Sequence, residues 1–331
     1  MDHNTIFNKL YMPKKQSGNR IIALDILKGV LIITVVIGHV YAPLRWLDVF
    51  WFHMPAFFMI SGYATKDWHF DTESLKKKIV RLWIPYATYC ILLLPFIPNV
   101  SYGRQLLKFV IGGGNSTTCL TYPFWFANSM LIACVAYSCL KTYVSSIVRI
   151  SFIFLVWIVI HIVHVPDYLP VYLPLGSDLA LGALCYIEIG ALMKKYANRY
   201  CCLLGLIPFG FAMCNGQGCI SFRLNMMSMI YNNICLDLLI PLSFTILLYG
   251  LCLYIEKCTI ISVVFQYIGT ASMSIMFMHI AIIYLSVSFG LPKLLCVMLG
   301  ILIPIVANYL YNLKPLTRLL FLGSYSDCKK T

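Results

Sequence analysis

The segment that decides the fold of this chain is LDILKGVLIITVVIGHV, residues 24–40. It is an almost unbroken apolar run, and its length approaches the ~20 residues with which a helix spans the hydrocarbon core of a bilayer. Further apolar runs lie at residues 152–163 and 238–254. The sequence therefore predicts transmembrane helices rather than the half-polar elements of a soluble domain.

The composition of the whole chain agrees with this prediction. Of 331 residues, 60% are hydrophobic, 15% are aromatic and only 11% are charged, whereas a soluble chain carries about 25% charged residues. This composition excludes a soluble globular enzyme. We predict an all-α, polytopic transmembrane helical bundle of about ten spans. The predicted spans are residues 21–43, 48–66, 79–98, 122–140, 148–166, 172–193, 201–213, 233–255, 262–286 and 290–312.

The distribution of cations predicts the side of the membrane on which each end of the chain lies. With the N-terminus inside, most of the 25 Lys and Arg residues fall in inner segments. The cations in outer segments are Arg45, Arg104, Lys108, Arg223 and Lys293. Because cytoplasmic segments carry the excess of Lys and Arg, we expect both termini to be cytoplasmic. The net charge of +13 then follows from topology, and no nucleic-acid partner is needed to explain it.

The chain is expected to form one membrane domain, residues 21–312. A polar cytoplasmic segment, residues 1–20, precedes it, and a cytoplasmic tail, residues 313–331, follows it. The first span is expected to stay in the mature protein, because its apolar run exceeds the usual core of about 7–15 residues in a signal peptide.

The cysteines and two of the histidines are expected to be structural. The 14 cysteines are scattered and predict no metal site or disulfide framework. Cys119, Cys214 and Cys219 fall in predicted outer loops and could pair in an oxidising compartment. His161 and His164 lie at the outer end of an otherwise apolar helix, where we expect them to be interfacial.

Ionisable residues inside the predicted spans carry most of the chemical information, because a charge within the bilayer costs at least about 2.5–3.5 kcal/mol. The first span holds Asp25, Lys28 and His39. Asp25 and Lys28 are three residues apart and can pair on one helix face. Lys28 and His39 share one stripe of the helix and lie roughly 16 Å apart along its axis. This helix is expected to carry polar groups along a path through the membrane.

Three histidines are expected near the outer face. His39 and His279 lie ~27 Å and ~26 Å from the inner ends of their spans, and His53 lies near the outer end of the second span. With Asp178 and Asp237 at the outer ends of their own spans, they predict an acid/base site reachable from outside. The alternative is that each histidine separately hydrogen-bonds a neighbouring helix.

Several stretches of the sequence resemble a known family. Residues 24–29, LDILKG, and 35–39, VVIGH, resemble the first span of the acyltransferase family 3 integral membrane proteins, in which ten residues separate a basic residue from a histidine. Residues 52–63, FHMPAFFMISGY, are similar to the second-span motif of the sugar or fucose O-acetylase branch. Residues 78–86, 124–126 and 267–279 resemble the patterns of later spans, although Lys78 stands where the family has arginine.

The resemblance covers nearly the whole chain and implies a function. It implies transfer of an acyl group, usually acetyl, from cytoplasmic acyl-CoA to a sugar hydroxyl of a cell-surface polysaccharide or its lipid-linked precursor. His39 would act as general base, with Lys28 near the thioester and His53 and His279 as further catalytic residues. Acetyl-CoA is the expected donor, and no metal is expected. The partners would be a glycan acceptor and the lipids of a bacterial plasma (inner) membrane.

The resemblance also implies binding residues, for which alternatives stay open. Lys76, Lys77, Lys78 and Arg81, at an inner helix entry, could bind the phosphates of acyl-CoA, with Lys28 nearer the acyl end. Alternatively, this cluster anchors the helix to anionic lipid, and Lys28 forms an internal pair with Asp25 or Glu188. The residues expected to bind the acceptor are Asp25, Ser61, Trp125 and Asp178.

Two other classes of function are compatible with charged groups inside a membrane. A transporter or flippase for a lipid-linked or organic-anion substrate also carries ionisable residues along its pathway. A non-catalytic glycan-binding membrane protein is the second alternative. Helices broken at the midplane would favour the transporter, whereas outer histidines above an inner basic pocket would favour the transferase.

Overall fold

The computed structural model describes residues 21–328 except residues 42, 44–45, 66–67, 99–100, 113–117, 164–172, 197–204 and 232, so His164 lies outside the described residues. The described chain is helical apart from its loops and an isolated antiparallel bridge between Asn225 and Ile230. The α-helices are α2 (Ile22–Val40), α3 (His53–Ala64), α4 (Thr72–Leu93), α5 (Tyr102–Ile111), α6 (Trp125–Tyr143), α7 (Ser146–Val163), α9 (Ser177–Tyr196), α10 (Leu206–Gly216), α11 (Leu236–Ile255), α12 (Thr259–Thr270), α13 (Ser272–Ser288), α14 (Lys293–Tyr311), α15 (Pro315–Leu322) and α16 (Tyr325–Cys328).

Six of the described helices are long and apolar enough to cross a membrane. They are α2, α4, α6, α9, α11 and α14, some extended by a short 3-10 turn. A seventh span results if α12 and α13 are counted together, although the two are bent by 72°. The all-helical membrane fold that the sequence predicts is confirmed. The number of ten spans and the cytoplasmic location of both termini stay predictions.

Two predicted spans differ from the helices that the structure contains. The second span, residues 48–66, begins with a 3-10 turn, η1 (Val49–Trp51), and Phe52 has a non-helical backbone, so α3 holds only 12 residues. The span at residues 262–286 is broken at Ala271, between α12 and α13. The break lies within a short run of small and polar residues, Gly269 to Ser272, with apolar residues on both sides of it.

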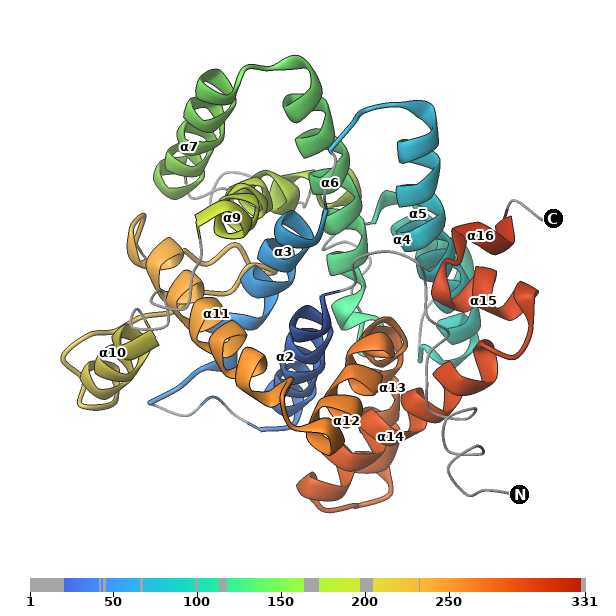
Figure 1. Cartoon of the computed structure of the whole chain (residues 1–331). Helices are drawn as coiled ribbons and strands as arrows, with labels where there is room; N and C mark the ends of the chain where they lie inside the picture. Colours follow the sequence, from blue (N-terminus) through green and yellow to red (C-terminus); the bar gives the residue numbers. More distant parts are fainter. Residues whose placement is uncertain are drawn as a thin grey trace.

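Helix α2 lies near the centre of the bundle and packs against α3, α11, α12, α13 and α14 (Figure 1). Its closest neighbour is α12, because Gly29 of α2 faces the backbone of Phe265 and Gly269 of α12. A Cβ atom at Gly29 or at Gly269 would overlap the facing backbone. Small residues at membrane helix contacts allow this close approach. The glycine pair therefore fixes the polar half of α2 against α12.

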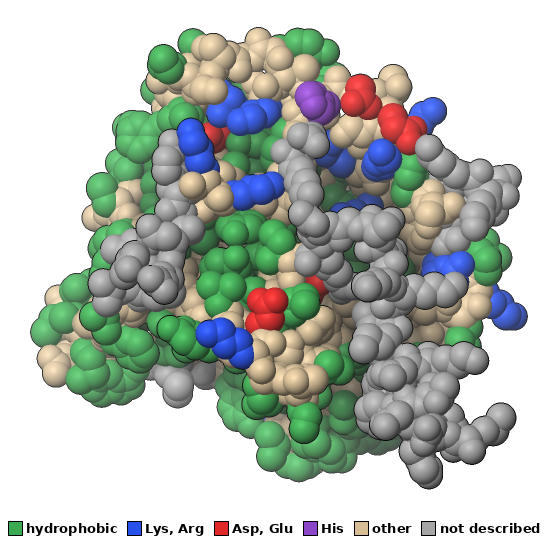
Figure 2. Space-filling view, in the orientation of Figure 1, with side chains coloured by type: hydrophobic (Ala, Val, Ile, Leu, Met, Phe, Trp, Pro, Cys, Tyr) green, Lys and Arg blue, Asp and Glu red, His purple; other side chains and the backbone are tan. Residues whose placement is uncertain are grey.

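Basic side chains gather over one end of the bundle (Figure 2). The helix ends there carry exposed cations, Lys76, Lys77, Lys141, Lys194 and Lys195. This is the end that the charge distribution predicts to be cytoplasmic. Part of the predicted C-terminal tail is also ordered, because α15 packs against α4.

A buried ion pair and a buried histidine–carboxylate contact join α7 to its neighbours. The guanidinium of Arg149 contacts both carboxylate oxygens of Glu188 on α9, with Nε–Oε2 at 3.0 Å and Nη2–Oε1 at 3.2 Å. His161 Nε2 lies 2.9 Å from Asp237 Oδ2 on α11. His161 is therefore buried and paired, not interfacial as predicted. Glu188, an expected alternative partner of Lys28, is instead paired with Arg149.

Candidate active site

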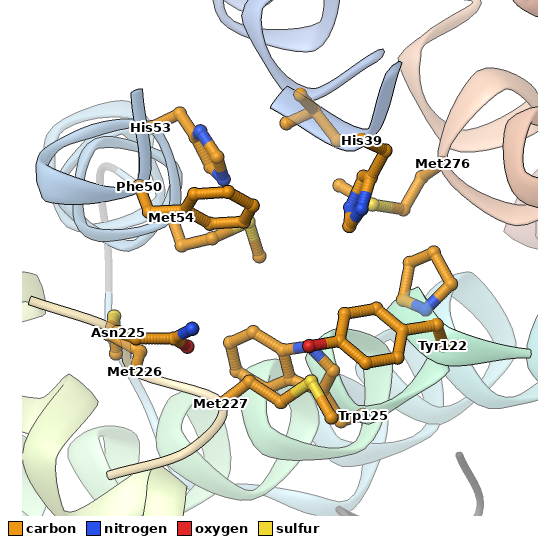
Figure 3. A pocket seen from close by; sticks show the side chains of 12 residues that line it. His39, Phe50, His53, Met54, Tyr122, Trp125, Asn225, Met226, Met227 and Met276 are labelled. Atoms are coloured by element: carbon orange, nitrogen blue, oxygen red, sulfur yellow. The ribbon is translucent and has the colours of Figure 1, made fainter. Parts of the chain in front are cut away.

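His39 lies in the last turn of α2, at the centre of a cluster of rings. Its ring centroid is 5.8 Å from that of Phe50 and 5.6 Å from that of Tyr122, both in edge-to-face contact. The His279 ring on α13 lies 5.2 Å away. The aromatic neighbours hold the His39 imidazole in place through its faces and edges, while the ring points toward the pocket (Figure 3).

His279 is oriented by its own helix. Its Nδ1 lies 2.8 Å from the carbonyl oxygen of Ile275, one turn earlier on α13. Because a carbonyl only accepts hydrogen bonds, Nδ1 carries the proton, and Nε2 has a lone pair when the ring is neutral. This Nε2 is buried and has no hydrogen-bond partner among the described residues. His279 thus presents a buried acceptor beside the His39 ring.

His53 begins α3 on another side of the same pocket. Its ring centroid lies 5.1 Å from that of Phe50, which also contacts His39. Its Nδ1 is buried and has no partner among the described residues. Buried polar groups in folded proteins are nearly always paired, so the ring nitrogens of His53 and His279 are candidates to bind a polar group of a ligand.

The pocket has a cavity volume of about 20 Å³, which is room for about one water molecule or hydroxyl group. Figure 3 shows how its side chains converge. The lining residues are Val35, His39, Phe50, His53, Met54, Tyr122, Pro123, Trp125, Asn225, Met226, Met227 and Met276. They come from the end of α2, the turn η1, the beginning of α3, the turn η4 (Tyr122–Phe124), the beginning of α6, α13 and the loop between α10 and α11.

The lining contains residues that the sequence analysis did not select. Val35 and Met276 lie one helical turn before His39 and His279, so helical spacing alone could have identified them. Asn225, Met226 and Met227 lie in a loop that has no hydrophobic period. The Asn225 side chain points into the pocket, and its Oδ1 accepts from the backbone N–H of Ser228 at 3.3 Å.

Lys28 and Asp25 pair as the spacing predicts, with Nζ and Oδ1 3.2 Å apart. They lie near the beginning of α2, and His39 lies near its end. Ile32 and Val35, on the same helix face between them, are 0% and 1% exposed. The expected polar path along α2 is therefore interrupted by apolar side chains in this structure.

The basic residues at the beginning of α4 lie at the cation-rich end of the bundle. Lys78 Nζ donates to Ser74 Oγ at 2.6 Å and lies 5.9 Å from the centre of the Trp68 ring. Lys77 contacts Glu73 at 3.8 Å. Arg81 is exposed one turn further along the helix. Because the pocket lies at the other end of α2, these cations and the three histidines form two separate polar regions.

The four residues expected to bind an acceptor lie in different places. Trp125 lines the pocket. Ser61 Oγ lies 3.4 Å from Cys134 Sγ, and Asp25 pairs with Lys28. Asp178 accepts from the backbone N–H of Leu179 at 2.9 Å at the beginning of α9. Of these four, only Trp125 shares the cavity with His39.

The described cysteines and acidic residues do not gather in one cluster. Among the residues that the structure describes, no group of three His, Cys, Asp or Glu side chains could hold a metal. Cys119, Cys214 and Cys219 are free thiols.

The fold and the pocket define a class of protein, a polytopic membrane protein with an imidazole site at one end of the bundle and cations at the other. The chain belongs to the acyltransferase 3 family, whose model, described as an acyltransferase domain, matches residues 21–307. The resemblance seen in the sequence is therefore confirmed.

The chain is also similar to the nodulation protein NolL of Mesorhizobium japonicum. The two are 27% identical over 142 residues, which cover 38% of this chain and 38% of that protein. The chain thus matches well under half of the length of this curated relative. No solved structure matches the chain significantly.

Proposed function

We propose that the protein is an O-acyltransferase that moves an acetyl group from cytoplasmic acetyl-CoA to a sugar hydroxyl of a cell-surface polysaccharide or its lipid-linked precursor. The observation that carries this proposal is the cavity at His39, which has room for about one hydroxyl group. Aromatic and amide side chains, Trp125 and Asn225, line the same cavity. A few polar groups in a mostly apolar, aromatic pocket are typical of small-molecule sites.

The proposed reaction transfers the acyl group directly from the thioester sulfur to the hydroxyl oxygen of the acceptor. The acceptor hydroxyl attacks the carbonyl carbon of the thioester, and His39 removes its proton as the C–O bond forms. The C–S bond then breaks, and the proton on His39 passes to the sulfur, which leaves as the thiol of CoA. The products are an acyl ester and free CoA, so His39 returns to its neutral state.

The other two histidines support this role. His279 lies beside His39, and its Nε2 can accept a hydrogen bond. If it accepts from one ring nitrogen of His39, the other ring nitrogen of His39 is directed toward the hydroxyl. His53 lies across the pocket and can donate to the oxygen on which charge develops. Both functions use ring nitrogens that the protein itself leaves unpaired.

The donor is proposed to bind from the cation-rich end. Lys77, Lys78 and Arg81 would hold the phosphates of acetyl-CoA. Lys28 lies nearer the pocket, and its side chain is 26% exposed although it pairs with Asp25. It would contact the pantetheine end or the thioester oxygen of the donor.

Replacing Arg81 with alanine is expected to raise the KM for acetyl-CoA several-fold with little change in kcat. Phosphate contacts far from the reacting carbon stabilise the ground and transition states alike. Titration of acetyl-CoA against the purified variant in detergent measures this. Lys257→Ala, which removes an exposed cation that rests on the Tyr254 ring, is the control. An unchanged KM would remove Arg81 from the donor site.

The proposed function itself is tested on the glycan. Cells without the protein are expected to make polysaccharide that lacks alkali-labile acetyl esters, and the unaltered gene should restore them. Mass spectrometry of the isolated glycan and of its lipid-linked precursor identifies the group and the sugar. Glycans with identical ester content in both strains would contradict the proposal.

One observation favours the transporter as a second candidate. The 72° bend between α12 and α13 lies beside Asp25 and Gly29 of α2, and broken helices are a feature of transporter substrate sites. A transporter moves its substrate without consuming acyl-CoA. Release of free CoA thiol that depends on the protein therefore separates the two functions.

A further inference from the structure

The cavity at His39 has an apolar floor built from the same three helices that carry the histidines. Val35, Met54 and Met276 line it. Val35 lies one turn before His39 on α2, Met276 lies one turn before His279 on α13, and Met54 follows His53 on α3. All three side chains are buried. Each histidine thus has an apolar residue beside it at the same cavity.

This floor lies on the side from which the donor is proposed to arrive. Helices α2 and α13 run parallel, because Gly269 before α13 contacts α2 near its beginning, whereas His279 contacts His39 near its end. Val35 and Met276 therefore lie on the Lys28 side of the imidazoles. Asn225 lies on a different wall, across the pocket from His39 (Figure 3). Val35 and Met276 thus lie on the donor side of the cavity, and Asn225 is a polar group on another wall, beside Met226 and Met227.

On the basis of the proposed function, we infer that Val35, Met54 and Met276 form the acyl-binding floor and restrict the transferred group to acetyl. These side chains bound one side of a cavity of about 20 Å³, which leaves little room beside the imidazoles. A longer acyl chain would overlap the floor with each added methylene. The reaction is unchanged, since only the group attached to the thioester carbonyl differs between donors.

Of the three residues, Val35 is expected to limit the length of the acyl chain most strongly. Methionine is unbranched and adapts its shape to what it contacts. Valine is branched at Cβ and has essentially one side-chain rotamer in a helix. Val35 also packs next to Ile32 on the helix face that leads from Lys28 to His39. Shortening Val35 is therefore the change that should admit a longer acyl chain.

The test is a competition between donors. Native membranes from cells that make the protein, which also contain the acceptor, receive equal concentrations of acetyl-CoA and butyryl-CoA. The ratio of the two ester products, measured by mass spectrometry, equals the ratio of kcat/KM for the two donors. Because it is a ratio, it does not depend on how much of a variant folds.

The unaltered protein is expected to favour acetyl by at least tenfold, since one methylene in an apolar pocket is worth roughly 10–200-fold. Val35→Ala should raise the butyryl share at least tenfold, and Met276→Ala should raise it by less. Val36→Ala is the matched control. Val36 is the next residue on α2 and equally buried, but it faces Gly300 of α14 rather than the cavity, so its product ratio should stay unaltered.

Two results would overturn the inference and leave the proposed function intact. One is equal use of both donors by the unaltered protein. The other is an unaltered product ratio in both Val35→Ala and Met276→Ala while acetyl ester is still formed. If the unaltered protein instead releases no CoA from any donor, the proposed function fails, and this inference fails with it.

Discussion

Membranes that contain the His39→Ala variant are expected to transfer acyl groups about 10²–10⁴-fold more slowly than membranes with the unaltered protein, because a positioned general base contributes about this factor. The side chain lies partly exposed among rings and makes no hydrogen bond among the described residues. Its removal should therefore leave the fold intact. The rate of ester formation, divided by the amount of protein in the membrane, measures the effect.

A second histidine provides the control for this experiment. His69 is exposed in the loop between α3 and α4, away from the residues that line the pocket. His69→Ala should keep the rate of the unaltered protein. Full ester formation by His39→Ala would end the assignment of His39 as base, whereas loss of the protein from the membrane would show a structural role instead.

The largest effect on stability is expected at the ion pair between Arg149 and Glu188. Their side chains are only 4% and 7% exposed, and two N–H groups meet the two carboxylate oxygens. Replacing Arg149 with methionine leaves the Glu188 carboxylate buried without its partner. Removing one member of a buried pair typically costs about 3–5 kcal/mol. Thermal unfolding in detergent, followed by the amount of monodisperse protein, measures the loss.

A double variant tests whether the loss of stability comes from the unpaired carboxylate of Glu188. Replacing both Arg149 and Glu188 with methionine removes both buried charges, and apolar replacement of a whole pair is often neutral or stabilising. The double variant should therefore regain most of the stability that Arg149→Met loses. The exposed pair of Lys77 and Glu73 is the control, because Lys77→Met should cost under about 1 kcal/mol. A double variant less stable than the single one would contradict the argument.

Hydrophobic patterning predicted the helices better than it predicted their breaks. The run at residues 24–40 becomes α2 almost as predicted, because an apolar helix in lipid must satisfy its own backbone. The break at Ala271 was missed, since apolar residues continue on both sides of it. Gly269, two residues before the break, closely contacts the backbone of α2, and a tertiary contact of this kind leaves no periodic signal.

The candidate site was predictable only where its residues lie on helices. The position of a residue along a helix follows from its number, so His39 and His279 could be predicted to lie at a similar depth in the membrane. In the structure their ring centroids lie 5.2 Å apart. Asn225 is held by a loop with a single bridge to Ile230, for which one sequence has no spacing rule. The pairing of Arg149 with Glu188, 39 residues away, likewise depends on how α7 packs against α9.

The buried side chains of Ile32 and Val35 have a consequence for the electrical state of the membrane. A continuous column of water between Lys28 and the imidazoles would let protons cross along one helix and dissipate the electrochemical gradient. Space between apolar side chains such as Ile32 and Val35 stays dry, because a buried water needs polar partners. Moving a charge through such space is costly. With both side chains packed at 0% and 1% exposure, apolar groups separate the titratable residues near the two ends of α2, so this face of the helix offers no such column.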